Sequence, residues 1–113
     1  MTQINIVRNG HWYDISIGGH AGYAQQGEDI VCAAISVLSY TLMQALRDAE
    51  EAGIIRSLRQ SIESGAVCAG YESIHHGTAN TILNTILCGF RMVEERYPDN
   101  CKVALADHGR GEK

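Results

Sequence analysis

Hydrophobic and polar positions alternate at the start of the chain, and this alternation predicts a β-hairpin. Apolar residues occupy every second position in residues 4–6 and again near the end of residues 12–17. Such period-2 patterns are typical of strands with one buried face. The Asn9-Gly10 pair lies between the two runs, and Asn-Gly is the strongest short hairpin signal. We therefore expect two antiparallel strands joined by a tight turn.

A glycine-rich stretch and a long helical pattern follow the hairpin. Gly18–Gly27 predicts a loop that can bend close to a ligand. We then expect a helix with Asp29 as its N-cap and Gly53 as its stop. Its apolar stripe is formed by Ile30, Ala34, Val37, Leu38, Leu42, Ala45, Leu46 and Ala49. A second face at helical spacing contains Cys32, Ser36, Ser39 and Met43.

The second half of the chain predicts a second hairpin and a second helix. Residues 54–63 fit either a strand or a short helix, and Ser64-Gly65 before an alternating run over residues 67–71 predicts a second hairpin. A second amphipathic helix contains Ala79, Ile82, Leu83, Ile86, Leu87, Phe90, Val93 and Tyr97. Pro98 ends this helix. Residues 103–106 could add a last strand before a frayed tail from His108.

The order ββαββα(β) predicts the α+β fold class, with two helices packed on one face of a small, mainly antiparallel sheet. A length of 113 residues fits one domain, residues 1–113. The longest unbroken apolar run, Ile30–Ile35, is shorter than the roughly 18 residues of a membrane span. Because the N-terminus also lacks the features of a secretory signal, we expect a cytoplasmic protein without membrane association.

The net charge limits the classes of partner. A formal charge of −4 and a pI near 5.6 disfavour a general nucleic-acid binder, because phosphate neutralisation needs clustered basic residues. The same charge suits a basic protein partner.

The four cysteines are the main candidates for chemistry. In a cytoplasmic protein, Cys32, Cys68, Cys88 and Cys101 are expected to be free thiols. Cys32 is predicted in the first turn of the first helix, where the helix dipole stabilises a thiolate. His20, in the glycine-rich stretch, could take the thiol proton. The alternative is a core cysteine and an ordinary loop histidine, and the spacing alone does not decide between them.

The residues around this pair resemble a known family. Gly19-His20-Ala21 and the segment Gly27–Leu38 are similar to the signature of the ribosomal-processing cysteine proteases, the Prp family of Firmicutes and related bacteria. Leu83–Phe90 and Tyr97-Pro98-Asp99 resemble the end of that family's second helix. The resemblance implies that His20 and Cys32 are the catalytic pair and that Asp29 and Ser36 are accompanying polar residues.

Several further properties are implied by the resemblance. It implies a cytosolic endopeptidase, a homodimer, that removes a short N-terminal extension from a large-subunit ribosomal protein by cutting after an aromatic residue. No metal or cofactor is implied. The glycines of the loop, Gly19, Gly22 and Gly27 among them, could let it close over a peptide or simply form turns. Asp29 could orient His20, cap the helix, or do both.

The middle of the chain departs from the family pattern. Residues 54–76 include Cys68 and an unusual His75-His76 pair. Such divergence also fits a protease that processes a phage structural precursor, and a non-enzymatic ribosome-assembly or interaction module remains a further alternative. A zinc site built from Cys68, His75, His76, Cys101 and His108 is disfavoured because the spacing typical of zinc ligands is absent. Cys88, inside the second helix, is expected to pack in the interior.

Overall fold

The computed structural model describes residues 1–19, 28–63 and 65–108, and only the backbone of residues 28 and 29. The described elements are β1 (Thr2–Asn9), β2 (Trp12–Gly18), α1 (Glu28–Glu51), β3 (Ile55–Glu63), β4 (Ala66–Ser73), α2 (His76–Arg96) and β5 (Cys101–Asp107). The segment that could have been strand or helix is therefore the strand β3. The last strand, which the sequence predicted only as an option, is present as β5.

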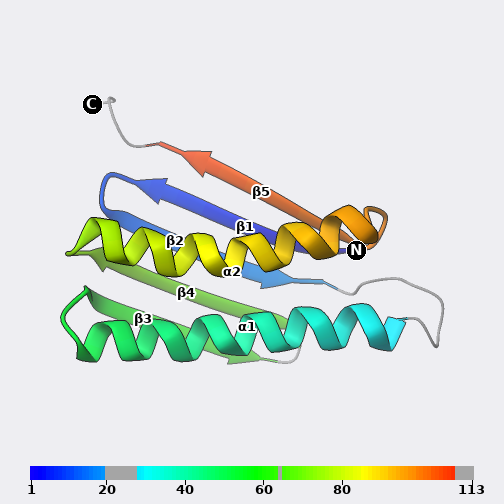
Figure 1. Ribbon diagram of the computed structural model, residues 1–113, viewed down its shortest axis with the longest axis horizontal. Helices are drawn as coiled ribbons and strands as arrows, with labels where there is room; N and C mark the ends of the chain where they lie inside the picture. The colour runs from blue at the N-terminus through cyan, green and yellow to red at the C-terminus, as the bar shows by residue number, and fades with distance from the viewer. Residues whose placement is uncertain (20–27, 64, 109–113) are drawn as a thin grey trace.

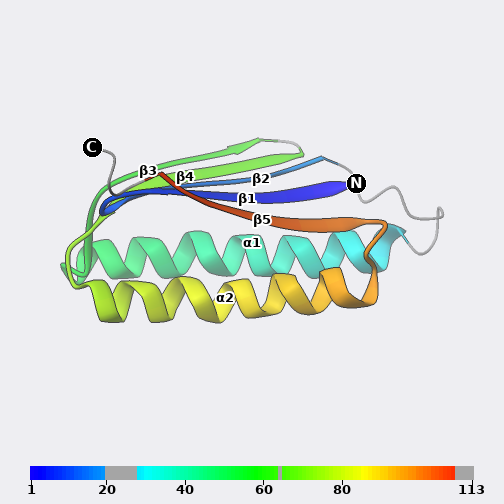
Figure 2. The ribbon, with the colours of Figure 1, turned by 90° about the horizontal axis from the view of Figure 1, so that it is seen from above.

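The five strands form one sheet in the order β3-β4-β2-β1-β5. All neighbours are antiparallel except β1 and β5, which run parallel. Both helices lie side by side on the same face of this sheet, as the edge-on view makes clear (Figure 2). The predicted α+β architecture is confirmed.

Glycines with a positive φ form the first hairpin turn and end α1. β1 and β2 pair from Asn9 opposite Trp12, so the two-residue turn is Gly10-His11 and not Asn9-Gly10. Gly10 has a φ of 66°, as the first central residue of a type II′ turn requires. Gly53 ends α1 with a φ of 77°. Its N–H donates to the Glu50 carbonyl, and the N–H of Ile54 donates to the Ala49 carbonyl, which together form a Schellman motif.

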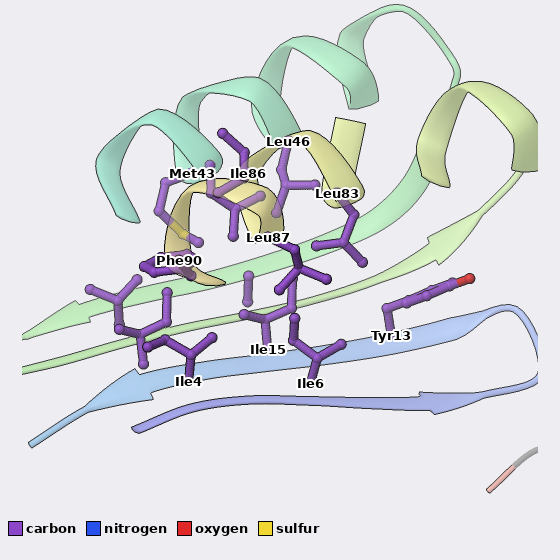
Figure 3. Packing of buried hydrophobic residues seen from close by; sticks show 14 of the residues in the cluster. Ile4, Ile6, Tyr13, Ile15, Met43, Leu46, Leu83, Ile86, Leu87 and Phe90 are labelled. Carbon is purple, nitrogen blue, oxygen red and sulfur yellow. The ribbon is translucent and has the colours of Figure 1, made fainter. Parts of the chain in front are cut away.

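The core lies between the sheet and the two helices. Alternate residues of β1 and β2, including Ile4, Ile6 and Ile15, point toward the helices, where they meet Leu83, Phe90 and their neighbours (Figure 3). Each fully buried Leu, Ile or Phe contributes about 1.5–3 kcal/mol. The alternation read from the sequence thus faces the core as predicted.

The apolar stripe predicted for α1 is partly wrong. Ile30 and Val37 are exposed by 60% and 64%, whereas Met43, assigned to the other face, is buried. The buried face of α1 is formed by Val31, Ile35, Ser39, Leu42, Met43, Leu46 and Ala49. The rotation follows from contact with two neighbours, the sheet and α2. The helices approach closely where a Cβ on Gly89 would lie 2.6 Å from Cδ2 of Leu38.

Two further findings concern α1 and the C-terminal tail. By length and composition the segment Ile30–Glu51 could cross a membrane, a test that core helices of soluble proteins also pass. At the C-terminus the N–H of His108 donates to the Arg8 carbonyl at 2.7 Å. The tail is thus still bonded at the residue where fraying was expected to begin, and residues 109–113 lie outside the described part of the chain.

Candidate active site

Cys32 is a free, partly buried cysteine near the start of α1. Because α1 begins at Glu28, Cys32 is its fifth residue and lies just beyond the first turn in which it was predicted. Asp29 lies inside the helix and is therefore not its N-cap, since a capping residue has non-helical backbone angles. The first backbone N–H groups of an α-helix have no partner within the helix, and they make this end of α1 suited to an anion.

A pocket of about 230 Å³ brings Cys32 together with segments that are distant in sequence. Its walls come from α1, from the end of β2 with Thr2, and from the hairpin between β3 and β4. The residues lining it are Thr2, Ile17, Gly18, Gly19, Cys32, Ile35, Ser36, Ser39, Tyr40, Glu63, Gly65, Ala66 and Val67. In Figure 1 these segments meet at the end of the molecule where α1 begins.

The end of β2 is held by close backbone contacts. Gly19 has a φ of 99°, and a Cβ on it would lie 2.5 Å from the carbonyl oxygen of Met1. Only glycine fits such a position without displacing backbone. The N–H of Gly19 also donates to the Gly65 carbonyl at 3.2 Å. The strand that leads toward residue 20 is therefore fixed against both the N-terminus and the β3–β4 turn.

The predicted site residues are only partly described. Cys32, Ser36 and Gly19 line the same pocket. His20, Gly22 and Gly27 lie outside the described residues, as does the side chain of Asp29. The pairing of His20 with Cys32 and the roles of Asp29 and Ser36 therefore stay predictions. Ser39, also in the pocket, donates its hydroxyl hydrogen to the Ile35 carbonyl at 2.7 Å.

The other three thiols lie in different surroundings. Cys68 and Cys88 are exposed, so the prediction that Cys88 packs in the interior is wrong. Cys88 lies on the outward side of α2, next to the buried Leu87. Cys101 is fully buried, and its burial, with a smaller effect of Glu94, raises the pKa of its thiol to about 11. Among the three, none lines the pocket that contains Cys32.

The histidine pair lies at the other end of the molecule, where α2 begins (Figure 1). The His76 ring stacks on His11 with 4.0 Å between centroids, and Ser73 Oγ lies 2.7 Å from His76 Nδ1. Within the described ranges no three His, Cys, Asp or Glu side chains are close enough to hold a metal ion together. The role of His75 and His76 suggested by this geometry is the anchoring of the β4–α2 junction.

Larger hollows exist elsewhere but lack a nucleophile with a neighbouring helix N-terminus. One of about 350 Å³ lies on the sheet face away from the helices and includes the exposed Cys68. Another of about 320 Å³ lies between α2, β1 and β5. The pocket at Cys32 is therefore the favoured candidate active site because it combines a thiol with a helix N-terminus, although it is not the largest of these three pockets.

Sequence reasoning missed several pocket residues, Glu63, Tyr40 and Thr2 among them. Tyr40 follows Cys32 and Ser36 at i+8 and i+4 on the same helix, so helical spacing could have found it. Glu63 and Thr2 come from segments that are far from Cys32 along the chain. The Ser64-Gly65 turn indicated a hairpin but not where its tip would lie, so no local pattern could have found these two.

A two-layer arrangement of two helices on one sheet face, with a free thiol in a pocket at a helix start, defines a small α+β protein suited to thiol chemistry. Comparison with family models finds a match to the cysteine protease Prp over residues 1–102. The chain therefore belongs to the family of cysteine protease Prp. A search of curated proteins gave no match.

Several solved structures share this fold. SMU.848 from Streptococcus mutans is 23% identical, with a TM-score of 0.67 over 96% of both chains. The essential ribosomal processing protease Prp from S. aureus, in complex with a covalently linked product peptide, is 26% identical, with a TM-score of 0.66 over 93% of this chain and 99% of that one. Its complex with a substrate peptide is 24% identical, with a TM-score of 0.58 over the same shares.

Proposed function

We propose that this cysteine protease removes a short N-terminal extension from a large-subunit ribosomal protein precursor, cutting after an aromatic residue. The single observation that carries the proposal is the free, partly buried Cys32 in a pocket at the start of α1. Membership of the Prp family supports it, and so does the S. aureus relative, a ribosomal processing protease solved with a covalently linked product peptide. The proposed substrate is a basic protein, which the net charge of −4 would attract.

The proposed mechanism uses a Cys32–His20 dyad. The Cys32 thiolate attacks the scissile carbonyl carbon, and the free N–H groups at the start of α1 stabilise the negative oxygen that forms. The C–N bond then breaks, and His20 gives its proton to the leaving amine. Water, losing a proton to His20, hydrolyses the thioester and releases the second product. Asp29 and Ser36 support the dyad, and Gly19, Gly22 and Gly27 let the loop follow an extended peptide.

Substitution of the nucleophile tests the proposal. Cys32→Ala should reduce cleavage of a peptide spanning the precursor junction to background, because no other group supplies the nucleophile. His20→Ala should leave a small residual activity, since the thiol remains. Cys88→Ala is the matched control, because it removes an exposed thiol on α2 and should cleave like wild type. Mass spectrometry of the products measures all three.

Two outcomes of this experiment would contradict parts of the proposal. Full activity in Cys32→Ala, with an unchanged circular dichroism spectrum, would rule out the nucleophile. A wild-type protein that spares the ribosomal peptide but cuts a phage structural precursor would retain the nucleophile and refute the substrate. The location proposed for this activity is the cytoplasm.

We also propose that the protein is a homodimer joined through its helix layer. Between Asp29 and Arg47 on α1, and between His76 and Arg91 on α2, there is no Asp, Glu, Lys or Arg. Solvent-facing helix surfaces normally carry charges, yet in the charge-free part of α1 Ile30 and Val37 are exposed by 60% and 64%. Met92, just beyond the charge-free part of α2, is exposed by 62%. An uncharged surface with exposed apolar side chains is typical of an interface.

A further inference from the structure

Among the described residues that line the pocket beside Cys32, one has a charged side chain. It is Glu63, and the other ionisable groups among them are the Cys32 thiol and the Tyr40 phenol. The other described lining residues contribute aliphatic side chains, hydroxyl groups and glycine backbone.

Glu63 lies on a strand that is paired in the sheet. It is the last residue of β3 and pairs with Ala66 across the hairpin. The adjoining turn contains Gly65, whose φ is 80° and whose carbonyl accepts the N–H of Gly19. The turn is therefore tied to the end of β2. A side chain on such a hairpin keeps its place relative to α1 better than one on a free loop.

The carboxylate of Glu63 is also free to bind a cationic group of a ligand. It is exposed, and within the described ranges it forms no ion pair and no hydrogen bond. Glu72 near the other end of the same hairpin differs, because its Oε1 accepts a hydrogen bond from Arg56 Nε at 2.8 Å. The hairpin thus has one carboxylate neutralised within the protein and one, that of Glu63, that is exposed on a residue lining the pocket.

We propose that Glu63 is a specificity residue that selects substrates with a lysine or arginine close to the scissile bond. This inference rests on the proposed function of the Cys32 pocket. A substrate ammonium or guanidinium group would donate hydrogen bonds to the Glu63 carboxylate. Peptide binding would displace water from the pocket and strengthen the attraction. Among the described lining residues there is no lysine, arginine or histidine that would compete for this carboxylate.

A peptide scan with charge variants tests this role. The probe is a peptide spanning the ribosomal precursor junction, in which each position from four before to four after the cut is in turn Lys, Gln or Glu. At the peptide position whose side chain reaches Glu63, wild type should cleave the Lys peptide roughly two- to five-fold more efficiently than the Gln peptide. A difference of this size is expected for one accessible ion pair. Glu63→Gln should abolish that preference, and Glu63→Lys should reverse it in favour of the Glu peptide.

A control variant and the dependence on salt distinguish a direct contact with Glu63 from an effect of the protein's net charge. Glu51→Gln removes the same charge from the far end of α1, roughly 28 Å of helix from Cys32 at 1.5 Å per residue. It should keep the wild-type preference. Raising the ionic strength should shrink the preference in wild type, since screening weakens an exposed pair.

The failures of the two proposals are distinguishable. Cleavage of all peptides with no dependence on charge would overturn the role of Glu63 and leave the protease function intact. An equal fall in kcat for every peptide in Glu63→Gln would also overturn it, because that pattern belongs to a residue that positions the catalytic groups. Absence of any cleavage by wild type, together with an unreactive Cys32, would instead refute the proposed function and with it this inference.

Discussion

At the residue scale, surroundings rather than residue type separate the four cysteines. Cys32 lies in a pocket near the positive end of α1, Cys68 and Cys88 face solvent, and Cys101 is fully buried. Burial and the nearby Glu94 raise the pKa of the Cys101 thiol to about 11, which leaves it protonated and unreactive near neutrality. The protein therefore contains its own internal controls for thiol reactivity.

Brief alkylation should reveal this difference. Near pH 7 iodoacetamide should modify Cys32 before Cys68 and Cys88, because the start of α1 favours an anion there. Cys101 should stay unmodified in the folded protein, because it is fully buried and its raised pKa keeps the thiol protonated. Peptide mapping by mass spectrometry measures the order, and thiol titration after unfolding should count all four. Faster modification of Cys68 or Cys88 in the native protein would count against Cys32 as the nucleophile.

At the element scale, β3 contains an irregularity with a defined structural cause. The pairing of β3 with β4 shifts register between Arg56 and Arg59, and Ser57 within this bulge has a φ of 59°. The N–H of Leu58 donates to Oε2 of Glu50 at 3.0 Å. A carboxylate from the last turn of α1 thus satisfies a backbone group that the bulge removes from the ladder.

Glycine substitutions on β3 should have opposite effects at two positions. A left-handed conformation costs a non-glycine residue roughly 1–2 kcal/mol, while glycine loses more entropy on folding, by roughly 0.5–1 kcal/mol. Ser57→Gly should therefore raise the free energy of unfolding by about 0.5 kcal/mol. Ser61→Gly, at an exposed position with ordinary pairing on the same strand, should lower it by about 0.5–1 kcal/mol. Urea unfolding measures both free energies of unfolding. If Ser57→Gly lowered the free energy of unfolding, the left-handed backbone at Ser57 would not be a source of strain that glycine removes.

At the scale of the whole molecule, the two helices leave one broad surface without charge. The sheet is covered on one face only (Figure 2), and the outer sides of α1 and α2 expose Ile30, Val37, Tyr40 and Met92. The exposed apolar side chains of α1 and α2 thus form a surface that packing within one chain does not cover.

The dimer proposed for this surface can be tested in solution. Light scattering at micromolar concentration should give twice the 12.3 kDa of one chain. Val37→Glu should shift the mass toward the monomer, because a charge buried at an interface without a partner is costly. Leu105→Glu, at an exposed apolar position on β5, should stay dimeric. If Leu105→Glu dissociated the dimer and Val37→Glu did not, the interface would lie at the β5 edge of the sheet instead. A monomeric wild type would refute the dimer.

Much of the fold could be predicted because its signals are local. Period-2 isoleucines, the glycines at positions 10, 53 and 65, and Pro98 act through backbone angles and hydrogen bonds within a few residues. These features predicted the first hairpin, both helices and the second hairpin, whereas residues 54–63 stayed open between strand and helix and the last strand stayed an option. The resemblance around Cys32 was also visible along the chain, since the segment Gly27–Leu38 is continuous. The sequence by itself was therefore enough for the fold class and for the nucleophile to be proposed.

What only the tertiary structure decided depends on contacts between distant segments. The rotation of α1, which exposes Val37 and buries Met43, is set by simultaneous packing on the sheet and on α2. The exposure of Cys88 and the parallel pairing of β5 with β1 have the same kind of cause. The pocket at Cys32 exists only because the β3–β4 turn is bonded to the end of β2, which brings Glu63 to a thiol 31 positions earlier in the chain. No local sequence pattern predicts such a contact. The free energy that stabilises it comes from packing between the sheet and the helices and not from any one segment.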